Sequence, residues 1–306
     1  MYKFIINPRA GKGKYKQDQL HQITKEITRI ARRNHIDHEI DISNYPGEAI
    51  QLSRQAAQKG FQIIVAVGGD GTVNEVANGM AESNAVLAAL PCGKGNDFAN
   101  ILSMPNQLEK AIHALFQGKI KLIDLGKALN RYFVNTAGVG FDAQVASRIN
   151  QQGTPFFKQS KWSYIYGVFA TFLTYHPLPM EIFLDGTAGD IHLQCSPMMV
   201  AVGIGRSCGG GIKVLPTSIQ DDGYFDVCVI DKMNKGNFLY YLPQVIAGKH
   251  VNLNQCYFYR ARKVNLKATQ PLTLHMEGEI FTEKEICFDL FHQKLKVLQA
   301  PMGLNY

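Results

Sequence analysis

The sequence predicts an α/β fold followed by a β-rich half, and two features carry this prediction. Over roughly the first 120 residues, short apolar runs alternate with stretches whose apolar residues recur at helical spacing. After about residue 125, short alternating or aromatic runs follow one another between Gly, Pro and Asp turns. The first pattern predicts a parallel sheet covered on both faces by helices, and the second predicts antiparallel sheet.

Length and composition favour two domains. The chain has 306 residues, 46% of them apolar, which is enough to bury a large core. We expect a first domain over residues 1–125 and a second over residues 126–306, whose last residues could pack back on the first. Apolar runs are too short for a membrane span, which favours a cytoplasmic protein. The six cysteines form no CxxC pair, which argues against a zinc site.

The elements of the first half follow in a regular order. Strands are expected at 2–6, 38–43, 62–67 and 86–91. Helices are expected up to Arg33, over 47–60, along the face that carries Val73 and Met80, in "NDFANIL", and in "LEKAIHALFQG". Each strand is therefore followed by a loop and a helix, as parallel sheets require.

The second half contains two expected helices, at about 159–173 and 236–247, between its strands. The first of them is rich in aromatic residues: Trp162, Tyr164, Tyr166, Phe169 and Phe172. These side chains alternate and then recur at helical intervals, which favours a place in the core over a lipid-contacting surface.

Two glycine loops lie where ligands of open parallel sheets bind, after the carboxyl ends of strands. The first, "NPRAGKGK" from Asn7, combines small residues with positive charge and could admit a phosphate, although an ordinary strand-to-helix turn explains it as well. The second runs from Gly68 to Thr72 as "GGDGT". Three glycines there need a reason, because glycine costs backbone entropy.

Two interpretations of Asp70 in this second loop stay open. In the structural one, Thr72 caps the following helix, Glu75 completes a capping box, and Asp70 competes for the cap. In the functional one, the backbone approaches a phosphate, and Mg²⁺ or its water shell lies between that phosphate and the Asp70 carboxylate. The third glycine, Gly71, favours the functional interpretation.

Five segments together resemble the diacylglycerol kinase catalytic-domain family of lipid kinases, in particular its soluble bacterial members. They are "NPRAGKGK", "GGDGTVNEVANG" with "PCGKGNDFA", "NTAGVGFDA", "CGGGIKVLPTSIQDDGYFDV" and "MEGE", and they extend over nearly the whole chain. The resemblance implies an N-terminal three-layer α/β nucleotide-binding domain with a parallel sheet and a C-terminal antiparallel β-sandwich-like domain. It also implies that ATP binds in the cleft.

The resemblance also assigns roles to individual residues. Glu279 would act as the general base that takes the proton from a lipid hydroxyl, and Asp70 would take part in catalysis. Without the resemblance, Glu279 is an ordinary acid in a turn. The ATP contacts implied are Asn7, Pro8, Arg9, Ala10, Gly11, Ser43, Gly68, Gly69, Gly71, Thr72, Asn74, Glu75, Lys94 and Asp97.

A magnesium site is implied at the second acidic turn, through the Asp222 carboxylate and the main-chain oxygens of Ile219 and Tyr224. Oxygen ligands suit this cation. The resemblance connects the metal with Asp70, Asp97 and Asp124, through waters. A helix cap remains the alternative for Asp97, and a structural role the alternative for Asp124.

The chain departs from the family at two points. Lys94 replaces the usual hydroxyl residue and could reach a phosphate as a point charge. Ile204 replaces the common asparagine, which we interpret as a change in the lining of the acceptor pocket.

The resemblance thus implies an ATP- and Mg²⁺-dependent lipid kinase that phosphorylates diacylglycerol or a related lipid at an anionic membrane surface. Residues 1–33 hold nine of the 32 Lys and Arg residues and two of the 25 acids, so a basic N-terminal helix could dock on that surface or simply be solvated. No nucleic-acid partner is expected, and a homodimer stays open. The alternatives are an NAD kinase-like enzyme and a non-catalytic, nucleotide-binding, lipid-sensing module.

Overall fold

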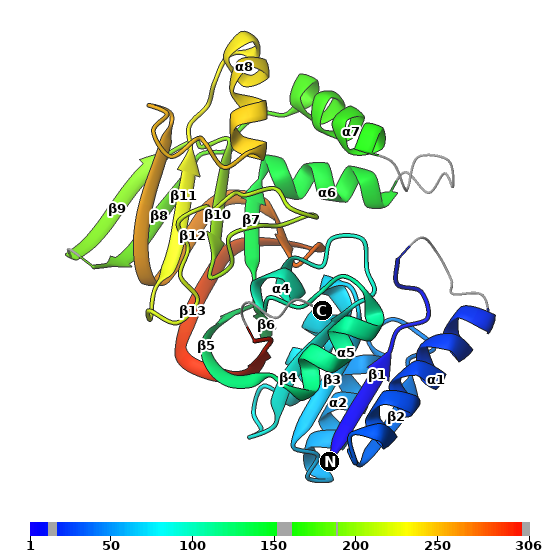
Figure 1. The fold of residues 1–306 in the computed structure, drawn as a ribbon. Helices are drawn as coiled ribbons and strands as arrows, with labels where there is room; N and C mark the ends of the chain where they lie inside the picture. Colours follow the sequence, from blue (N-terminus) through cyan, green and yellow to red (C-terminus); the bar gives the residue numbers. More distant parts are fainter. Residues whose placement is uncertain (12–16, 152–160, 188, 302–306) are drawn as a thin grey trace. The chain divides into compact units, whose positions relative to one another are not determined.

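The computed structural model describes residues 1–11, 17–151, 161–187 and 189–301 (Figure 1). The chain divides into two compact units. The first contains Met1–Leu125 together with the segment that begins at His292, and the second contains Gly126–Phe291. One strand, β13 (Glu279–Gln299), pairs with strands of both units, and each unit is described by itself below.

The first unit is built on a parallel sheet. Its strands are β1 (Tyr2–Ile6), β2 (His38–Ile42), β3 (Ile63–Gly68) and β4 (Val86–Pro91), in the order β4-β3-β1-β2. The end of β13 (Glu279–Gln299) pairs in parallel with β4 through Val297 and Leu87. β1, β3 and β4 are almost wholly buried, as expected for strands covered on both faces. The predicted parallel sheet is confirmed.

Five helices follow these strands in the part of the first unit that the structure describes. They are α1 (Gln17–Arg33), α2 (Glu48–Gln58), α3 (Asp70–Met80), α4 (Asp97–Ile101) and α5 (Leu108–Phe116). α2 packs against α3, and α1 packs against α5, so the two pairs form the outer layers of a three-layer α/β unit (Figure 1). The apolar periodicity predicts these helices because each helix buries one stripe of apolar side chains against the sheet, as Ile27 and Ile30 of α1 do.

The second unit is an antiparallel, β-sandwich-like domain, as the resemblance implied. Its strands are β6 (Arg131–Phe133), β7 (Thr136–Gly140), β8 (Met180–Gly186), β9 (Gly189–Cys195), β10 (Met199–Gly203), β11 (Phe225–Ile230) and β12 (Cys256–Met276), with the first part of β13. β5 (Lys119–Ala128) leads into it from the first unit. β12 is long enough to pair in turn with β11, β8, β7 and β13, which closes the strands around a core that contains Phe133, Phe225 and Phe288.

Among its described residues, the second unit contains the helices α6 (Phe141–Gln151), α7 (Lys161–Thr174) and α8 (Lys235–Ile246). The sequence predicts α7 and α8 but misses α6, although Phe141, Val145 and Ile149 recur at the i, i+4 spacing that marks a helix. Of the aromatic stretch, Phe172 is partly buried and packs against the core, where it stacks on Phe238 with ring centroids 3.8 Å apart. Phe169 is 46% exposed, so the core prediction is wrong for it. The side chains of Trp162, Tyr164 and Tyr166 lie outside the described residues.

Candidate functional site

Three loops of the first unit meet at the carboxyl edge of its parallel sheet, after β1, β3 and β4. The Asn7 side-chain amide, at the end of β1, donates to the Thr72 hydroxyl after β3 over 2.9 Å. The Asn7 carboxamide oxygen accepts from the Arg9 N–H at 2.9 Å, which holds the turn that follows. Gly11 has φ +77°, and a Cβ there would lie 3.1 Å from the carbonyl oxygen of Cys92, after β4. The first loop is therefore tied to both others.

The second and third loops touch backbone to backbone at Gly69 and Gly93. A Cβ on Gly93 would lie 2.3 Å from the Gly69 Cα, a distance that real side chains do not adopt. Asn96 holds the other side of this contact, since its side-chain oxygen accepts from the Gly93 N–H at 2.8 Å while its backbone has φ +56°. The packing of the protein itself therefore requires a glycine at position 93, and it leaves little room for a side chain at Gly69, where a Cβ would lie 3.1 Å from the Gly93 Cα.

Asp70 joins the same two loops through its side chain. It is the first residue of α3, and its Oδ1 accepts from the Phe98 N–H at 3.0 Å, in the first turn of α4. Asp70 thus satisfies an otherwise orphan helix donor across 28 positions of sequence. The alternative in which Asp97 caps its helix is wrong, because Asn96 is the N-cap of α4 and Asp97 is the buried first residue of the helix.

The predicted capping box at Thr72 is also wrong. α3 begins two residues earlier, with Gly69 as N-cap, so Thr72 lies within its first turn and is buried. Glu75 turns away from that end and accepts from the Gly47 N–H at 3.2 Å, before α2. Both residues instead connect α3 to neighbouring segments of the first unit.

Gly71 differs from its neighbours, because the protein's own atoms do not explain the absence of a side chain there. A Cβ on Gly68 would collide with Thr72, whereas a Cβ on Gly71 would meet nothing within 4 Å among the described residues. Gly71 is exposed in the first turn of α3, where backbone N–H groups point out of the helix. The Cβ-free surface at Gly71 therefore faces open space.

The remaining predicted ATP contacts of the first unit surround these loops. Ser43 is buried after β2, and its hydroxyl donates to the Ile6 carbonyl oxygen at 3.4 Å. Lys94 and Arg9 are exposed in the loops after β4 and β1, and Pro8 and Ala10 lie between Asn7 and Gly11. Asn74 accepts from the Asn78 side chain one turn later in α3, through its backbone carbonyl at 3.0 Å. Asn74 lies within α3, after the glycine loop, and this contact is internal to the helix.

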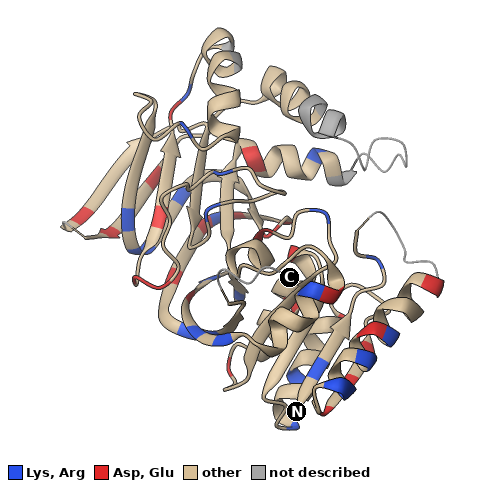
Figure 2. Cartoon of the chain, viewed as in Figure 1, with Lys and Arg blue, Asp and Glu red and all other residues tan. Residues whose placement is uncertain are grey.

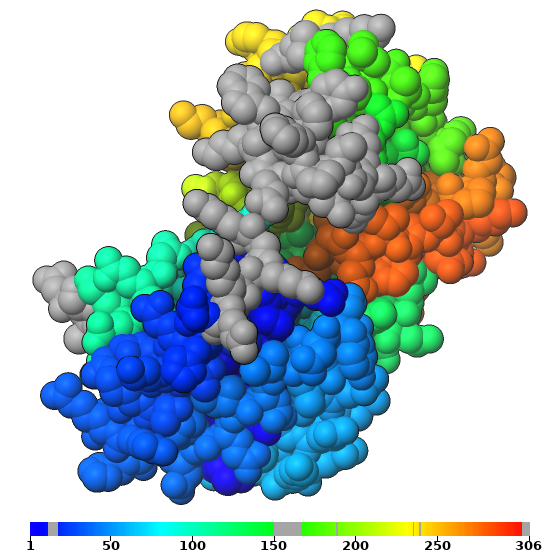
Figure 3. Space-filling view, turned by 90° about the vertical axis from the view of Figure 1, so that its right-hand side faces the viewer, coloured from blue at the N-terminus to red at the C-terminus, as the bar shows by residue number. Residues whose placement is uncertain are grey.

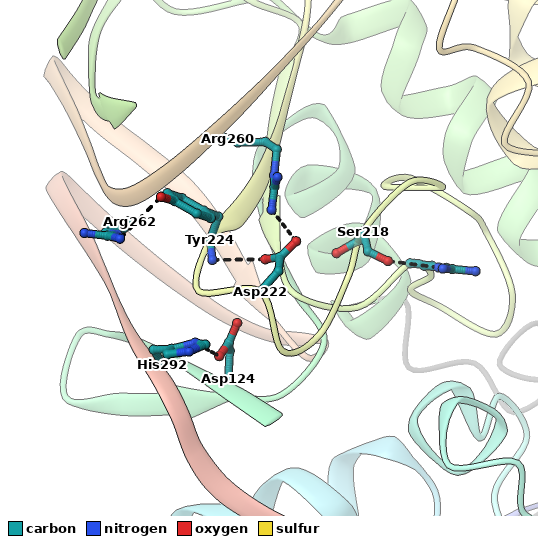
Figure 4. A network of polar contacts seen from close by, with 8 residues as sticks. Asp124, Ser218, Asp222, Tyr224, Arg260, Arg262 and His292 are labelled. Carbon is teal, nitrogen blue, oxygen red and sulfur yellow. Dashed lines mark hydrogen bonds and ion pairs between the residues drawn. The ribbon is translucent and has the colours of Figure 1, made fainter. Parts of the chain in front are cut away.

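Asp124 is fully buried and has a structural partner. Its Oδ1 accepts from Nδ1 of His292 at 2.8 Å (Figure 4). The same oxygen accepts from the Gln293 N–H, also at 2.8 Å. Gln293 has φ +47°, an unfavourable backbone conformation for a residue with a side chain. The Asp124 carboxylate therefore holds the point at which β13 enters the first unit, which supports the structural alternative for this residue.

In the second unit, Glu279 lies at the tip of the hairpin between β12 and β13. Its side chain is 50% exposed, and its Oε2 lies 3.5 Å from the Arg131 guanidinium. The neighbouring Glu277 points back into the unit, where its Oε1 accepts from the N–H groups of Val134 and Asn135 at 2.9 and 2.6 Å. Sequence reasoning missed Glu277, although a glutamate in a two-residue turn is an unusual choice that could have drawn attention to it.

A second pair holds the same hairpin from its other side. His275 Nε2 lies 3.0 Å from Oδ2 of Asp142, the second residue of α6. Burial opposes the charged imidazolium, but the nearby Asp142 carboxylate outweighs it and raises the pKa of His275. Gly138 leaves room for this pair, because a Cβ there would lie 1.8 Å from Asp142 Oδ2.

The predicted metal turn, 219–224, is organised by side-chain contacts (Figure 4). Asp222 Oδ1 accepts from the Tyr224 N–H at 3.2 Å, and Oδ2 is bound by Arg260. The Arg260 and Arg262 guanidinium groups lie 4.9 and 5.1 Å from the centroid of the Tyr224 ring. One carboxylate and two main-chain oxygens suit Mg²⁺ in ligand type. Arg260 competes with such a cation for Asp222.

The described residues contain no cluster of three or more His, Cys, Asp or Glu side chains that could by itself hold a metal ion. A cation at the turn would therefore depend on main-chain oxygens and on one carboxylate, as the resemblance implies.

An apolar cavity lies between the helices of the second unit and its sheet. It has a volume of about 80 Å³ and is open to solvent. Its walls include Phe141, Val168, Met199, Phe238, Val245 and Ile246. Asp142 is the one carboxylate among the described residues that line it. α7 and α8, which contribute to the walls, lie together at one end of this unit (Figure 3).

Ile204 does not line this cavity. It is fully buried in the sandwich core, and its N–H donates to the Asn135 carbonyl oxygen at 2.9 Å. The interpretation of Ile204 as a change in pocket lining is therefore wrong for this cavity.

The basic excess of residues 1–33 is partly neutralised within the first unit. Lys3 is buried and forms ion pairs with Glu39 and Asp41, and Arg29 bonds to Glu26 and to Glu109 of α5. Acidic and basic side chains both mark α1 (Figure 2). Exposed Lys25, Arg32 and Arg33 remain on this helix, whereas Lys12, Lys14 and Lys16 lie outside the described residues. Among the described helices, none is long and apolar enough to cross a membrane.

The structure thus brings most of the predicted ATP residues together at one edge of the first unit, whereas Glu279 and Asp222 belong to the second. The chain thus has a two-domain architecture: a parallel α/β unit whose glycine loops contact one another, followed by an antiparallel β-sandwich-like unit. Residues 1–128 match the diacylglycerol kinase catalytic domain, and residues 135–299 match the YegS C-terminal NAD kinase beta sandwich-like domain. The chain belongs to the diacylglycerol kinase catalytic-domain family.

Similar proteins cover nearly the whole chain. A diacylglycerol kinase of Bacillus subtilis (strain 168) is 28% identical over 280 residues, which are 90% of this chain and 89% of that protein. One from Staphylococcus aureus (strain bovine RF122 / ET3-1) is 28% identical over 290 residues, with 90% and 85% covered. The crystal structure of a putative diacylglycerol kinase from Bacillus anthracis str. Sterne shares the fold, with a TM-score of 0.78 at 24% identity over 98% of this chain and 97% of that one.

Proposed function

We propose that this protein is a lipid kinase that transfers the γ-phosphoryl group of ATP to the hydroxyl of diacylglycerol or a related lipid. The observation that carries the proposal is the exposed, Cβ-free surface at Gly71, framed by loops that the protein's own packing locks together. The similar proteins from Bacillus and Staphylococcus that are named diacylglycerol kinase support the same reaction.

The glycine loops suit a triphosphate for electrostatic reasons. The first turn of α3 offers backbone N–H groups and the positive end of a helix dipole, and Lys94 and Arg9 are exposed in the adjoining loops. Because the loops are already held by Asn7, Asp70 and Asn96, little ordering is needed when the nucleotide binds. Mg²⁺, when bound through Asp222 and the main-chain oxygens of Ile219 and Tyr224, would supply charge that offsets the phosphates.

Glu279 is the proposed general base. Its carboxylate is half exposed at a hairpin tip, so a substrate hydroxyl can approach it, and the Arg131 guanidinium, 3.5 Å away, would compensate its charge. The proposed reaction needs the glycine loops to hold the nucleotide and Glu279 to accept the proton of the attacking hydroxyl.

The apolar cavity of the second unit supports a lipid as the acceptor. Its walls are apolar apart from a few groups such as Asp142, as expected for a site that takes up part of an acyl chain. Only the hydroxyl end of such a lipid needs polar groups of the protein, such as the proposed base Glu279. NAD, the acceptor in the NAD kinase-like alternative, carries no acyl chain and has no use for such a cavity.

The function is tested by offering γ-labelled ATP with single acceptors, with and without Mg²⁺. We expect label in a diacylglycerol phosphate only when Mg²⁺ is present. Label in NADP would identify the NAD kinase-like alternative. ATP binding without transfer to any lipid, including phosphatidylglycerol, a sphingoid base and a polyprenol, would identify a non-catalytic module.

Filling the cavity should weaken use of the acceptor selectively. Val245→Trp places a large ring in the cavity wall on α8 and is expected to lower kcat/KM for a long-chain diacylglycerol by about tenfold or more, with ATP binding unchanged. Gln244→Trp is the matched control, because Gln244 does not line the cavity. Equal activity of both variants would exclude this cavity as the acceptor site.

We further propose that the protein acts in the cytoplasm as a peripheral enzyme and that α1 contributes to docking on anionic lipid. Charge reversal at Lys25, Arg32 and Arg33, all exposed on α1, should weaken binding to vesicles that contain phosphatidylglycerol, by about 1 kcal/mol for each residue near the surface. Reversal of Arg29, which is already paired with Glu26 and Glu109, should have less effect on binding. Vesicle binding unaffected by the triple reversal would remove α1 from the docking surface.

A further inference from the structure

The hairpin that presents Glu279 has an unusual turn. Met276 and Glu279 pair directly, so the loop between β12 and β13 consists of Glu277 and Gly278 alone. Both have positive φ, +52° and +87°, as in a type I′ turn. Glycine adopts this conformation readily, but at the first position short polar residues such as asparagine are preferred. Glutamate at position 277 therefore needs a reason outside the turn itself.

The contacts of the Glu277 side chain supply that reason. Its Oε1 accepts from two successive backbone N–H groups, those of Val134 at 2.9 Å and Asn135 at 2.6 Å, between β6 and β7. Val134 and Asn135 are 1% and 2% exposed, so these donors lie where water cannot easily replace the carboxylate. Hydrogen bonds to an ionised acceptor are among the stronger ones in proteins. Glu277 thus fastens the hairpin tip to the β6–β7 connection.

Glu279 itself lacks comparable support from its own side chain. It is half exposed, and the Arg131 contact at 3.5 Å is long for an ion pair with directional hydrogen bonds. The position of its carboxylate is therefore set mainly by the backbone of the hairpin tip. The side chain of Glu277 holds that tip to the β6–β7 connection. We propose that Glu277 is a positioning residue for phosphoryl transfer, which holds the Glu279 carboxylate in register with the acceptor hydroxyl. This inference rests on the proposed function.

The rest of the hairpin does not depend on this tether. The end of β12 pairs with β7 through Leu274, His275 and Met276, and His275 also bonds to Asp142. Loss of the Glu277 contacts should therefore displace the tip and leave the sheet intact. A displacement of about 1 Å at a reacting group can cost about 100-fold in rate, since transfer depends on a near-attack geometry.

The test compares five variants, one of them Glu279→Gln, in the full-length protein with ATP and diacylglycerol in mixed micelles. Glu277→Ala and Glu277→Asp, the latter one methylene too short to reach both N–H groups, should lower kcat by about tenfold to 100-fold with KM for ATP within about twofold. Glu277→Gln keeps an acceptor oxygen at the same reach and should restore kcat to within about threefold of wild type. Glu283→Ala, an exposed acid on the same hairpin, is the matched control.

The outcomes separate this inference from the proposed function. If Glu277→Asp and Glu277→Ala keep wild-type kcat while Glu279→Gln is inactive, Glu277 is not a positioning residue and the base assignment stands. If KM for ATP rises in parallel with the loss of kcat, the effect is general to the fold and the inference is overturned. If Glu277→Ala does not fold, the other two Glu277 variants test the inference: kcat should be low for Glu277→Asp and near wild type for Glu277→Gln, and equal kcat values would overturn it.

Discussion

Glu279→Gln should abolish phosphoryl transfer while leaving ATP binding almost unchanged. The substitution keeps the size and the hydrogen-bonding reach of the side chain but removes its ability to accept a proton at neutral pH. Loss of a general base costs about 100-fold to 10,000-fold in rate. Initial rates with labelled ATP and diacylglycerol measure the transfer, and calorimetric titration of the same samples with ATP measures binding.

The exposed position of Glu279 makes this variant easy to interpret. Its side chain is 50% exposed, so the fold loses little when the charge is removed, and thermal unfolding should stay close to that of wild type. Glu283→Gln on the same hairpin serves as control. Turnover by Glu279→Gln within threefold of the wild-type rate would show that another group accepts the proton.

The second large effect is expected at the contact between the glycine loops. A Cβ on Gly93 would lie 2.3 Å from the Gly69 Cα and 2.8 Å from the Asn96 side-chain oxygen, and the backbone at Gly69 cannot move away as a flexible side chain could. Overpacking of this kind costs about 1–3 kcal/mol. Gly93→Ala should therefore separate the two loops, lower Tm, and weaken ATP binding by about tenfold to 100-fold.

Gly71→Ala is the matched comparison, because it should weaken ATP binding without lowering Tm. A methyl group at Gly71 meets no protein atom within 4 Å among the described residues, and alanine favours the helix by about 0.5–1 kcal/mol over glycine. Its Tm should therefore stay constant or rise, whereas ATP binding should fall because the methyl group occupies the space next to the α3 backbone. Unchanged ATP affinity in Gly71→Ala would mean that no phosphate approaches this surface.

The parts of the fold that depend on residues close together in the sequence could be predicted. Apolar periodicity defines the helices of the first unit, because each helix buries one face, and continuous apolar runs define β1, β3 and β4, because these strands are covered on both faces. The helix α6 was missed although Phe141, Val145 and Ile149 carry the right spacing, because the glycines that precede it resemble a turn. The family resemblance supplied the sandwich, which local patterns alone left as antiparallel sheet.

The site could be predicted in part, and the failures share a cause. Glycines at the strand ends predict an approach of the backbone to a phosphate, whereas the structure shows that Gly69 and Gly93 approach each other. The partner of Asp70 could not be predicted, since Phe98 is 28 residues away and belongs to another loop. Glu277 is the same kind of case, because its two N–H donors come from a segment more than 140 positions earlier. Contacts between distant segments depend on the tertiary fold.

The central claim is that this chain moves the γ-phosphoryl group of ATP onto a lipid hydroxyl, and a single-turnover experiment tests it most directly. Enzyme in excess over γ-labelled ATP is mixed with diacylglycerol in micelles with Mg²⁺, and the labelled products are separated over time. We predict that the label passes in a single phase into a diacylglycerol phosphate monoester, and that it does so with wild type and not with Glu279→Gln. Label that stays in bound ATP, or that is released only as inorganic phosphate, would contradict the account.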